Sequence, residues 1–286
     1  MNLQQLEYIV AVDIHRHFAR AAESCHVTQP TLSMMIRKLE DELDTLIFDR
    51  SRQPVMPTEA GTEIIEQARI ILQETERLRE ITRVHKGIIN GELRVGIIPT
   101  LAPYLLPLFI NPFLDKYPSI RLRVAEYTTE TLLEKLRTGE LDVGILVTPL
   151  EVNFVREIPL FYEAFMVYAS HQYKKEYLMV EDINPDELWL LEEGHCFRSQ
   201  IMNLCELRRQ RNVHMEYAAG SIETLKQLVE KRMGVTILPE LATLSLSSEQ
   251  QLRLKPFQPP APVREVSLVT HRNYIKARMV EALKEE

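Results

Sequence analysis

Two cysteines in the second half of the chain, Cys196 and Cys205, have the clearest capacity for chemistry. Cys196 follows a glycine and precedes a stretch of helical character, a position where the helix dipole favours the thiolate form of the side chain. His195 and Arg198 lie within local reach and can support that form. Because the thiolate is the form that attacks peroxides, these four residues predict a redox-active or nucleophilic site.

The spacing of the two thiols limits what they can do together. Cys205 lies nine residues after Cys196, which on one unbroken helix places the side chains on opposite faces, about 13 Å apart along the axis. A disulfide requires Cα atoms within roughly 7 Å, so a bond between them requires the segment to unwind, as in a two-state redox switch. The residues alone leave a second interpretation open, in which both cysteines are inert buried thiols.

Length and composition place the chain among globular proteins of more than one domain. Its 286 residues exceed one typical domain, and a hydrophobic content of 45% is ordinary for a soluble protein. Three cysteines do not make a disulfide framework, and no C-x-x-C motif or His/Cys cluster predicts a metal or another cofactor. The first residues lack an export signal, and prolines interrupt the most apolar stretch, residues 97–114. We therefore expect a cytoplasmic protein with no membrane association.

The first 43 residues have the pattern of three short helices. Apolar side chains recur at helical spacing in residues 3–14, an alanine-rich helix is expected at 18–24, and Cys25 lies in the following break as a small packing residue. Thr28 offers an N-cap to a third helix that runs to about Leu43. A helix, a short turn and a capped helix with polar residues at its front predict a helix-turn-helix, whose second helix enters the DNA major groove.

The charge of the chain does not indicate DNA binding. The net charge is −7, and residues 1–52 carry more acidic than basic side chains, so the prediction depends on the pattern alone. Arg37 and Lys38 on the third helix suit phosphates or guanine edges. A three-helix bundle with no nucleic-acid partner explains the same periodicity.

A long amphipathic helix is predicted between Thr58 and about Lys86. The stretch contains no proline, and its apolar side chains recur every three or four residues with charged residues between them. A helix of this length does not bury such a stripe by itself, so a partner helix is the expected solution. The alternative is that the stripe packs on the helix's own domain.

Apolar strands alternate with helical segments in the rest of the chain. Strands are expected at residues 93–98, 122–126, 141–147, 165–169, 188–191, 235–238 and 266–269, and helices at 103–116, 131–138, 222–232 and the end of the chain. This alternation predicts an α/β fold with parallel strands and crossover helices. Such sheets bind ligands at the carboxyl ends of their strands.

The two halves together resemble the LysR-type transcriptional regulators. The likeness is carried by residues 21–33, 36–43, 48–50 and 58–61 in the first half and by 139–145 and 234–239 in the second. It implies a winged helix-turn-helix DNA-binding domain over 1–58, a linker helix for dimerisation over 59–90, and a two-lobed α/β regulatory domain over 91–286 that is similar to periplasmic binding proteins. Met35 stands where the family usually has glutamine, which puts the local base contacts in doubt.

The resemblance also implies how the first domain meets promoter DNA and what it assembles with. The expected contacts are made by Thr28, Gln29, Pro30, Thr31, Ser33, Met34, Arg37, Lys38 and Arg52. Two chains would pair through the linker helix, and two such dimers would form a homotetramer. RNA polymerase would be the protein partner at the double-stranded promoter.

The cysteine segment is similar to that of the peroxide-sensing branch of this family. The shared pattern is Gly-His-Cys-x-Arg-x-Gln-x-Met-x-x-Cys, over residues 194–205. It implies that hydrogen peroxide oxidises Cys196 and that Cys205 resolves the product to an intramolecular disulfide. Ser199 stands where the branch usually has aspartate, so the reaction rate or the handling of protons is in doubt.

Other positions match residues that surround the reactive cysteine in that branch. Thr100 and Thr129 have hydroxyl groups that can hold the peroxide oxygens, and Arg264 can stabilise the thiolate and developing negative charge. His195 can take part in the polar network. Simpler interpretations are also open: Thr129 as a helix cap, Arg264 as a partner in a surface ion pair, and His195 as a turn residue.

We therefore expect a DNA-binding regulator, not an enzyme, that senses hydrogen peroxide and activates oxidative-stress genes. One alternative is the same regulator triggered by a small organic ligand in a cleft between the lobes, with the cysteines as bystanders. Another is a thiol peroxidase or a hydrolase that uses Cys196 and His195. The helix-turn-helix argues against the enzymes, because catalysis does not need one.

Overall fold

The computed structural model describes residues 1–85, 90–170, 173–191, 200–201, 221–231, 234–272, 274 and 276–286. The chain divides into two compact units, Met1–Ile88 and Ile89–Glu286, called here the N-terminal unit and the regulatory unit. The finer division into residues 1–58, 59–90 and 91–286 stays a prediction.

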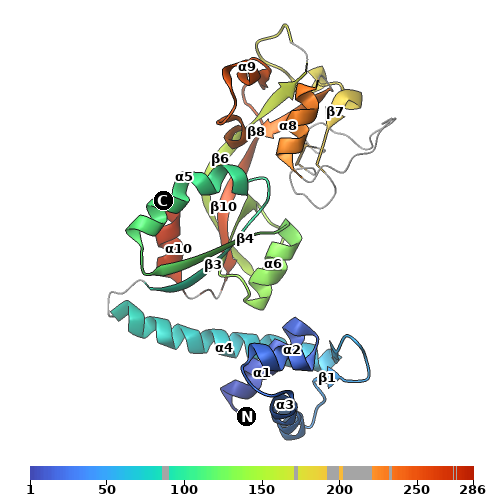
Figure 1. The fold of residues 1–286 in the computed structure, drawn as a ribbon, viewed down its shortest axis with the longest axis vertical. Coiled ribbons are helices and arrows are strands. Elements are labelled where there is room, and N and C mark those ends of the chain that lie inside the picture. The colour runs from blue at the N-terminus through green and yellow to red at the C-terminus, as the bar shows by residue number, and fades with distance from the viewer. Residues whose placement is uncertain are drawn as a thin grey trace. The chain divides into compact units, whose positions relative to one another are not determined.

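Three helices open the N-terminal unit at the positions expected from the sequence. They are α1 (Leu3–His15), α2 (Phe18–Ser24) and α3 (Gln29–Leu43), shown in blue in Figure 1. A polar side chain caps each helix: Asn2, His17 and Thr28 each accept a hydrogen bond from a backbone N–H of the first turn. These caps satisfy donors that a helix start leaves unpaired, which is why local sequence fixes the helix starts.

A two-stranded wing follows α3. Strand β1 (Phe48–Asp49) pairs antiparallel with β2 (Met56–Pro57). The buried ring of Phe48 meets Phe18 of α2 edge-on, with ring centroids 6.0 Å apart. A Cβ atom on Gly61 would lie 2.0 Å from the carbonyl oxygen of Ile47, so the chain requires a glycine where the next helix passes the wing.

Helix α4 (Glu59–His85) completes the N-terminal unit. Ile65 and Ala68 from its first half are buried in the same core as the three preceding helices. The alternative in which the stripe packs on its own domain therefore holds for this part of the helix. Further along, Leu78 is 68% exposed. Pairing of α4 with a second chain stays a prediction, and Leu78 is an apolar side chain that such pairing would cover.

A mixed sheet forms the centre of the regulatory unit. Its strands are β3 (Gly91–Ile97), β4 (Ile120–Glu126), β5 (Val143–Thr148), β6 (Val155–Ala169), β7 (Leu188–Trp189), β8 (Val235–Pro239), β9 (Leu254–Pro256) and β10 (Val263–His271). They follow the order β4-β3-β5-β10-β6-β8-β7, and β9 also pairs with β6.

The helices of the regulatory unit cover this sheet. They are α5 (Ala102–Lys116), α6 (Thr129–Thr138), α8 (Ile222–Glu230), α9 (Ser248–Gln251) and α10 (Ala277–Lys284), with 3₁₀ helices η1 (Val180–Asp182), η2 (Pro185–Glu187) and η3 (Glu240–Thr243). Across the described parts of both units, no helix has the length and hydropathy that a membrane crossing requires.

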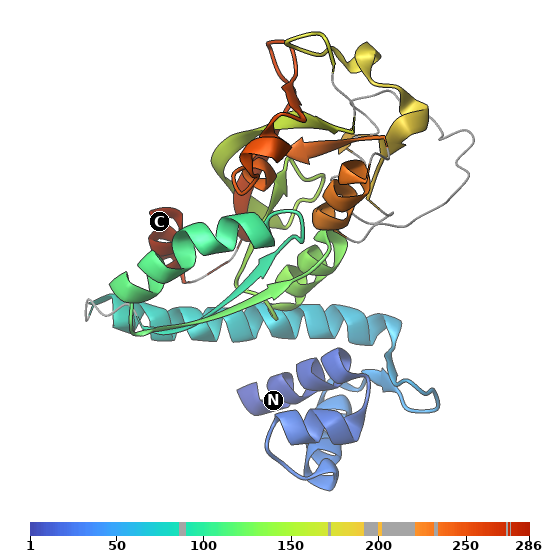
Figure 2. The ribbon, with the colours of Figure 1, turned by 45° about the horizontal axis from the view of Figure 1, so that its top comes forward.

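The expectation of parallel strands is right for part of this sheet and wrong for the rest. Strand β3 is parallel to β4 and β5, and β7 is parallel to β8. In contrast, β10 is antiparallel to both β5 and β6, and β6 is antiparallel to β8. The reason is that β6 carries the chain away from β3–β5 and β10 brings it back (Figures 1 and 2). Alternation of strands and helices along the sequence does not reveal such a return.

Two hydrophobic cores lie along these crossing strands and define two lobes. The first lobe contains β3, β4 and β5 with α5, α6 and α10, and the second contains β7 and β8 with α8. Strand β6 serves both, with Val155 in the first core and Val167 in the second. The strand predicted at 165–169 is therefore only the second-lobe end of β6. The predicted two-lobed α/β architecture is confirmed.

A buried carboxylate ties the first lobe together. Asp142, 4% exposed, accepts hydrogen bonds from the backbone N–H of Arg94 at 2.8 Å and from its guanidinium at 3.0 Å. The guanidinium donates twice, through Nε and Nη2, and the ammonium of Lys276 adds a fourth hydrogen bond at 3.0 Å. Burial raises the pKa of Asp142, but the hydrogen bonds and charges of Arg94 and Lys276 outweigh burial and hold the pKa below its ordinary value.

We predict that Asp142→Asn lowers the unfolding free energy of the regulatory unit by about 3 kcal/mol near pH 7, because it leaves two cations without their partner. A carboxyl with a depressed pKa stabilises the fold above its unfolded pKa of about 4 and loses that contribution as the pH falls through the folded value. The difference between wild type and variant should therefore shrink below about pH 4.

Urea unfolding followed by the fluorescence of Trp189, the one tryptophan of the chain, measures this unit. Asp115→Asn, at an exposed position on α5, is the matched control and should change stability by less than about 0.5 kcal/mol. An equal loss for both variants would contradict the role given to Asp142.

Candidate redox site and DNA interface

Described residues that lie close in sequence to the two predicted cysteines are buried in the second lobe. Outside the described residues lie Cys196, Cys205, His195, Arg198 and Ser199. Between the two cysteines, Ile201 is fully buried in the second core. Leu191 before the segment and Ile222 after it belong to the same core.

Arg264 is the centre of a buried polar cluster in the regulatory unit. Its side chain is 1% exposed and lies on β10, within the last strand. Nη1 donates to the hydroxyl oxygen of Thr100 at 3.1 Å and Nη2 to the Thr100 carbonyl oxygen at 3.3 Å. Nε donates to the carboxylate of Glu163 at 2.7 Å. The surface ion-pair interpretation of Arg264 is therefore wrong, because the pair is buried.

Thr129 is not the cap of helix α6. The neighbouring Thr128 takes that position and accepts from the backbone N–H of Thr131 at 3.4 Å. The Thr129 hydroxyl oxygen is buried and has no hydrogen-bond partner among the residues that the structure describes. A buried hydroxyl without a partner costs free energy, so this atom is available to a small polar ligand.

Two polar residues of the regulatory unit, Glu163 and Gln200, were given no role by reasoning from sequence. No sequence motif surrounds Glu163. A buried arginine requires a counter-charge, so an acidic partner for Arg264 could have been expected, although not its position in the sequence. Gln200 lies inside the cysteine motif itself. Its side-chain oxygen is buried without a hydrogen-bond partner within the described part of the chain.

A hydrogen bond joins the lobes beside the buried cluster. The hydroxyl of Tyr104, on α5, donates to Glu223 Oε1 at 2.7 Å, and the ammonium of Lys226 donates to the same oxygen at 2.9 Å. Glu223 and Lys226 lie on α8 of the second lobe. Burial raises the pKa of Tyr104 and the adjacent Glu223 carboxylate raises it further, so the phenol stays protonated and remains a donor.

The arrangement can stabilise negative charge. A guanidinium fixed by Thr100 and Glu163 in a dry interior is a preorganised cation, which favours an anion or a developing oxyanion nearby. Among the described residues no group of three or more His, Cys, Asp or Glu side chains could hold a metal ion. The contribution that Arg264 can make to chemistry is electrostatic, through its fixed positive charge.

Cys25 differs from the predicted redox pair. It is half-buried and packs against the core of the N-terminal unit. Burial raises the pKa of the Cys25 thiol, which disfavours the reactive thiolate. The structure agrees with its interpretation as a packing residue.

The side chains expected to contact DNA lie at the surface of α3 and the wing. Ser33 is half-buried, and the exposed ones are Thr28, Gln29, Pro30, Thr31, Met34, Arg37, Lys38 and Arg52. These side chains are accessible to a partner, with Met34 at 63% and Arg52 at 70% exposure. Which of these side chains touch bases stays a prediction.

The departure at Met35 concerns packing as well as recognition. Its side chain is half-buried and packs against the core of the N-terminal unit. Its carbonyl oxygen accepts a hydrogen bond from the side-chain amide of Gln5 at 3.2 Å. Both contacts tie α3 to α1, so an apolar side chain is accommodated at this position.

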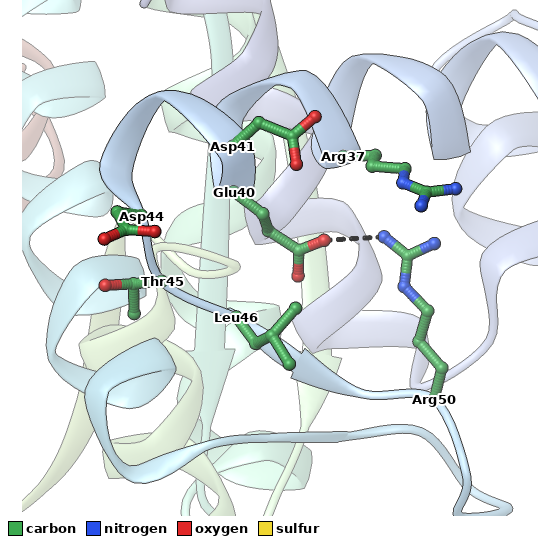
Figure 3. Close-up of a pocket in the computed structure, with 7 residues that line it drawn as sticks. All are labelled: Arg37, Glu40, Asp41, Asp44, Thr45, Leu46 and Arg50. Atoms are coloured by element: carbon green, nitrogen blue, oxygen red, sulfur yellow. Dashed lines mark hydrogen bonds and ion pairs between the residues drawn. The ribbon is translucent and has the colours of Figure 1, made fainter.

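Glu40 fixes the wing to helix α3, a role that sequence reasoning missed. Its buried carboxylate accepts the backbone N–H groups of Ile47 at 2.9 Å and Phe48 at 3.2 Å, and it pairs with Arg50 at 2.7 Å. Figure 3 shows this pair at one side of a pocket of about 470 Å³, with the guanidinium of Arg37 beside that of Arg50. The C-terminal half of α3 and the start of the wing are thus held together.

The chain matches two family descriptions that together span both units. Residues 3–62 match the bacterial regulatory helix-turn-helix protein, lysR family, and residues 86–286 match the LysR substrate binding domain.

Proteins of similar sequence cover almost the whole chain. A hydrogen peroxide-inducible genes activator of Haemophilus influenzae is 37% identical over 273 residues, which is 94% of this chain and 90% of the relative. The DNA-binding transcriptional dual regulator OxyR of Escherichia coli is 39% identical over 273 residues, 94% of this chain and 89% of the relative.

Solved structures show the same fold. A full-length OxyR variant from Pseudomonas aeruginosa has a TM-score of 0.84 and 37% identity, and covers 100% of this chain and 94% of its own. An OxyR variant from Corynebacterium glutamicum with bound hydrogen peroxide has a TM-score of 0.63 and 29% identity, with coverage of 99% and 90%.

We predict that Arg37→Ala weakens binding to a labelled random-sequence duplex and makes its salt dependence shallower. Each lost phosphate contact reduces the slope of log K against log salt by about 0.9. Fluorescence anisotropy from low to moderate salt measures both quantities. Arg121→Ala, an exposed arginine of the regulatory unit, is the matched control and should leave affinity and slope unchanged. If wild type and Arg37→Ala had equal slopes of log K against log salt, Arg37 would not contact a DNA phosphate.

Proposed function

The chain belongs to the LysR family of bacterial regulators, and from this premise we propose that it senses hydrogen peroxide and activates transcription. The observation that carries the proposal is its likeness, over 94% of its length, to proteins named hydrogen peroxide-inducible genes activators. A helix-turn-helix unit and a buried Arg264 held beside the Thr100 hydroxyl support it.

The first chemical step is the oxidation of Cys196. Its thiolate sulfur attacks one oxygen of hydrogen peroxide, an S–O bond forms and the O–O bond breaks. The departing hydroxide takes a proton and leaves as water, and Cys196 becomes a sulfenic acid. Thr100 and Thr129 hold the peroxide oxygens, and the fixed charge of Arg264 stabilises the thiolate and the negative charge that develops on the leaving oxygen.

The second step transfers the oxidation to Cys205. Its thiolate attacks the sulfur of the Cys196 sulfenic acid, an S–S bond forms, and the sulfenic oxygen leaves as water. The two thiols together lose two electrons to one peroxide. Because the spacing of the cysteines forbids this bond on one intact helix, the disulfide stabilises a different conformation of the segment. His195 and Arg198 support the thiolate before the reaction.

The regulatory change is read out on promoter DNA. Helix α3 enters the major groove with the polar residues at its front, and the wing contacts the adjacent backbone. Two chains pair through α4, two dimers form a tetramer, and the promoter-bound assembly engages RNA polymerase in the cytoplasm. The protein acts as a sensor and not as an enzyme, so it consumes one peroxide for each disulfide and then stops.

We predict that one equivalent of hydrogen peroxide links Cys196 to Cys205 in the reduced, full-length protein. Thiol alkylation followed by peptide mass mapping should show a two-proton mass loss that joins the two cysteine peptides. Cys205→Ser should instead leave a sulfenic acid on Cys196, which a sulfenic-acid reagent traps.

Cys25→Ser is the matched control, because it removes the other cysteine of the chain and should leave the disulfide yield unchanged. If both thiols survive many equivalents of peroxide, the proposed function is wrong, and a small-molecule inducer becomes the trigger to look for. Continuous peroxide turnover with a thiol reductant would instead indicate a peroxidase.

A further inference from the structure

We propose that Glu163 is a positioning residue for the peroxide reaction, which it serves by holding Arg264 in place. The inference rests on the proposed function, since it concerns the cation that we propose stabilises the Cys196 thiolate. Glu163 itself touches neither peroxide nor cysteine in this account. It acts through the orientation of one guanidinium.

The sheet register places the two residues opposite each other. Arg264 on β10 pairs with Glu163 on β6 in the antiparallel ladder, and directly paired residues on one face of a sheet lie close enough to interact. The side chains of both are almost fully buried, at 1% and 2% exposure. A lone arginine charge in such a place is costly, and the carboxylate removes most of that cost.

The two carboxylate oxygens of Glu163 do different work. One oxygen, Oε2, accepts from Arg264 Nε at 2.7 Å, which fixes one edge of the guanidinium plane. The other, Oε1, accepts from the backbone N–H of Leu241 at 2.7 Å. With the Nε edge held, the opposite edge of the guanidinium faces Thr100 and donates to it twice.

These contacts connect the two lobes. Thr100 follows β3 of the first lobe, and Leu241 lies in η3, directly after β8. This 3₁₀ helix touches both cores, with Leu241 packed on the first and Ala242 buried in the second. Strand β6 passes from the first core to the second around Glu163, with Phe161 packed on the first and Phe165 in the second. The carboxylate therefore fixes the cation at the place where the two cores meet.

Only a carboxylate satisfies both donors. A glutamine at this position has one acceptor oxygen and one amide N–H₂ group, so either Leu241 N–H or Arg264 Nε–H would face another donor. The guanidinium would then lose its fixed orientation. Small displacements of a group that stabilises charge have large effects on rate, about 100-fold for a misplacement of 1 Å.

A double-mutant cycle in the full-length protein tests the inference. The second-order rate of Cys196 oxidation by hydrogen peroxide is measured for wild type, E163Q, R264M and E163Q/R264M. We expect R264M to react about 100-fold more slowly and E163Q roughly 10-fold more slowly. In the R264M background the second substitution should cost nothing further, because Glu163 acts through Arg264.

Two additional variants separate positioning from folding. E163D keeps the charge on a side chain one methylene shorter and should recover part of the rate that E163Q loses. E157Q makes the same chemical change elsewhere on β6, where Glu157 accepts from the backbone N–H of Leu150 at 2.8 Å, and should react like wild type. Melting curves followed by Trp189 fluorescence identify variants that do not fold. If E163Q does not fold, the rates of E163D and of the charge-balanced variant E163Q/R264M are used for the test.

The outcomes distinguish the inference from its premise. If the wild-type protein does not react with hydrogen peroxide, the proposed function itself is wrong. Two results with a reactive wild type would overturn the role of Glu163. In the first, E163Q reacts at the wild-type rate. In the second, the double variant is slower by the full product of the two single effects. In both cases the proposed peroxide-sensing function would still stand.

Discussion

A guanidinium keeps its charge when it is buried in a protein, so its burial is costly unless a carboxylate balances the charge and acceptors take the N–H groups. In the regulatory unit Arg264 meets this condition through Glu163 and Thr100. The condition explains the architecture around it, because β6 and β10 must cross between the lobes in register to bring arginine and carboxylate together. The peroxide chemistry proposed for Cys196 depends on that fixed cation.

The N-terminal unit uses the same physical device for a different purpose. Glu40, like Glu163, is a buried carboxylate that accepts backbone N–H groups from a neighbouring element and pairs with an arginine. In one case the arginine lies between the recognition helix and the wing, and in the other it lies between two lobes. In each unit the carboxylate joins two segments of the chain through hydrogen bonds and one ion pair, which holds the arginine in a fixed orientation.

Local features of the sequence predicted what is locally determined. The cap at Thr28 placed α3 correctly, and the apolar periods placed most strands and helices of both lobes. The first half of β6 and its antiparallel direction were missed. Both depend on how the chain crosses from the first lobe to the second on β6 and comes back on β10, which no local pattern reveals. Glu163 was missed for a similar reason, since its partner lies 101 residues away. Thr100, Thr129 and Arg264 were predicted only through family resemblance. The structure was needed to show that Arg264 is buried and that the Thr129 hydroxyl has no hydrogen-bond partner among the described residues.

The most direct test of the central claim is a DNA footprint of the full-length protein before and after one equivalent of hydrogen peroxide. The probe is a duplex selected from a random pool for binding to the reduced protein. The account predicts that the protected region shifts or changes in length on oxidation, that dithiothreitol restores it, and that Cys196→Ser shows no change. Identical footprints from fully reduced and fully disulfide-bonded protein would contradict it, because the redox chemistry would then have no effect on DNA.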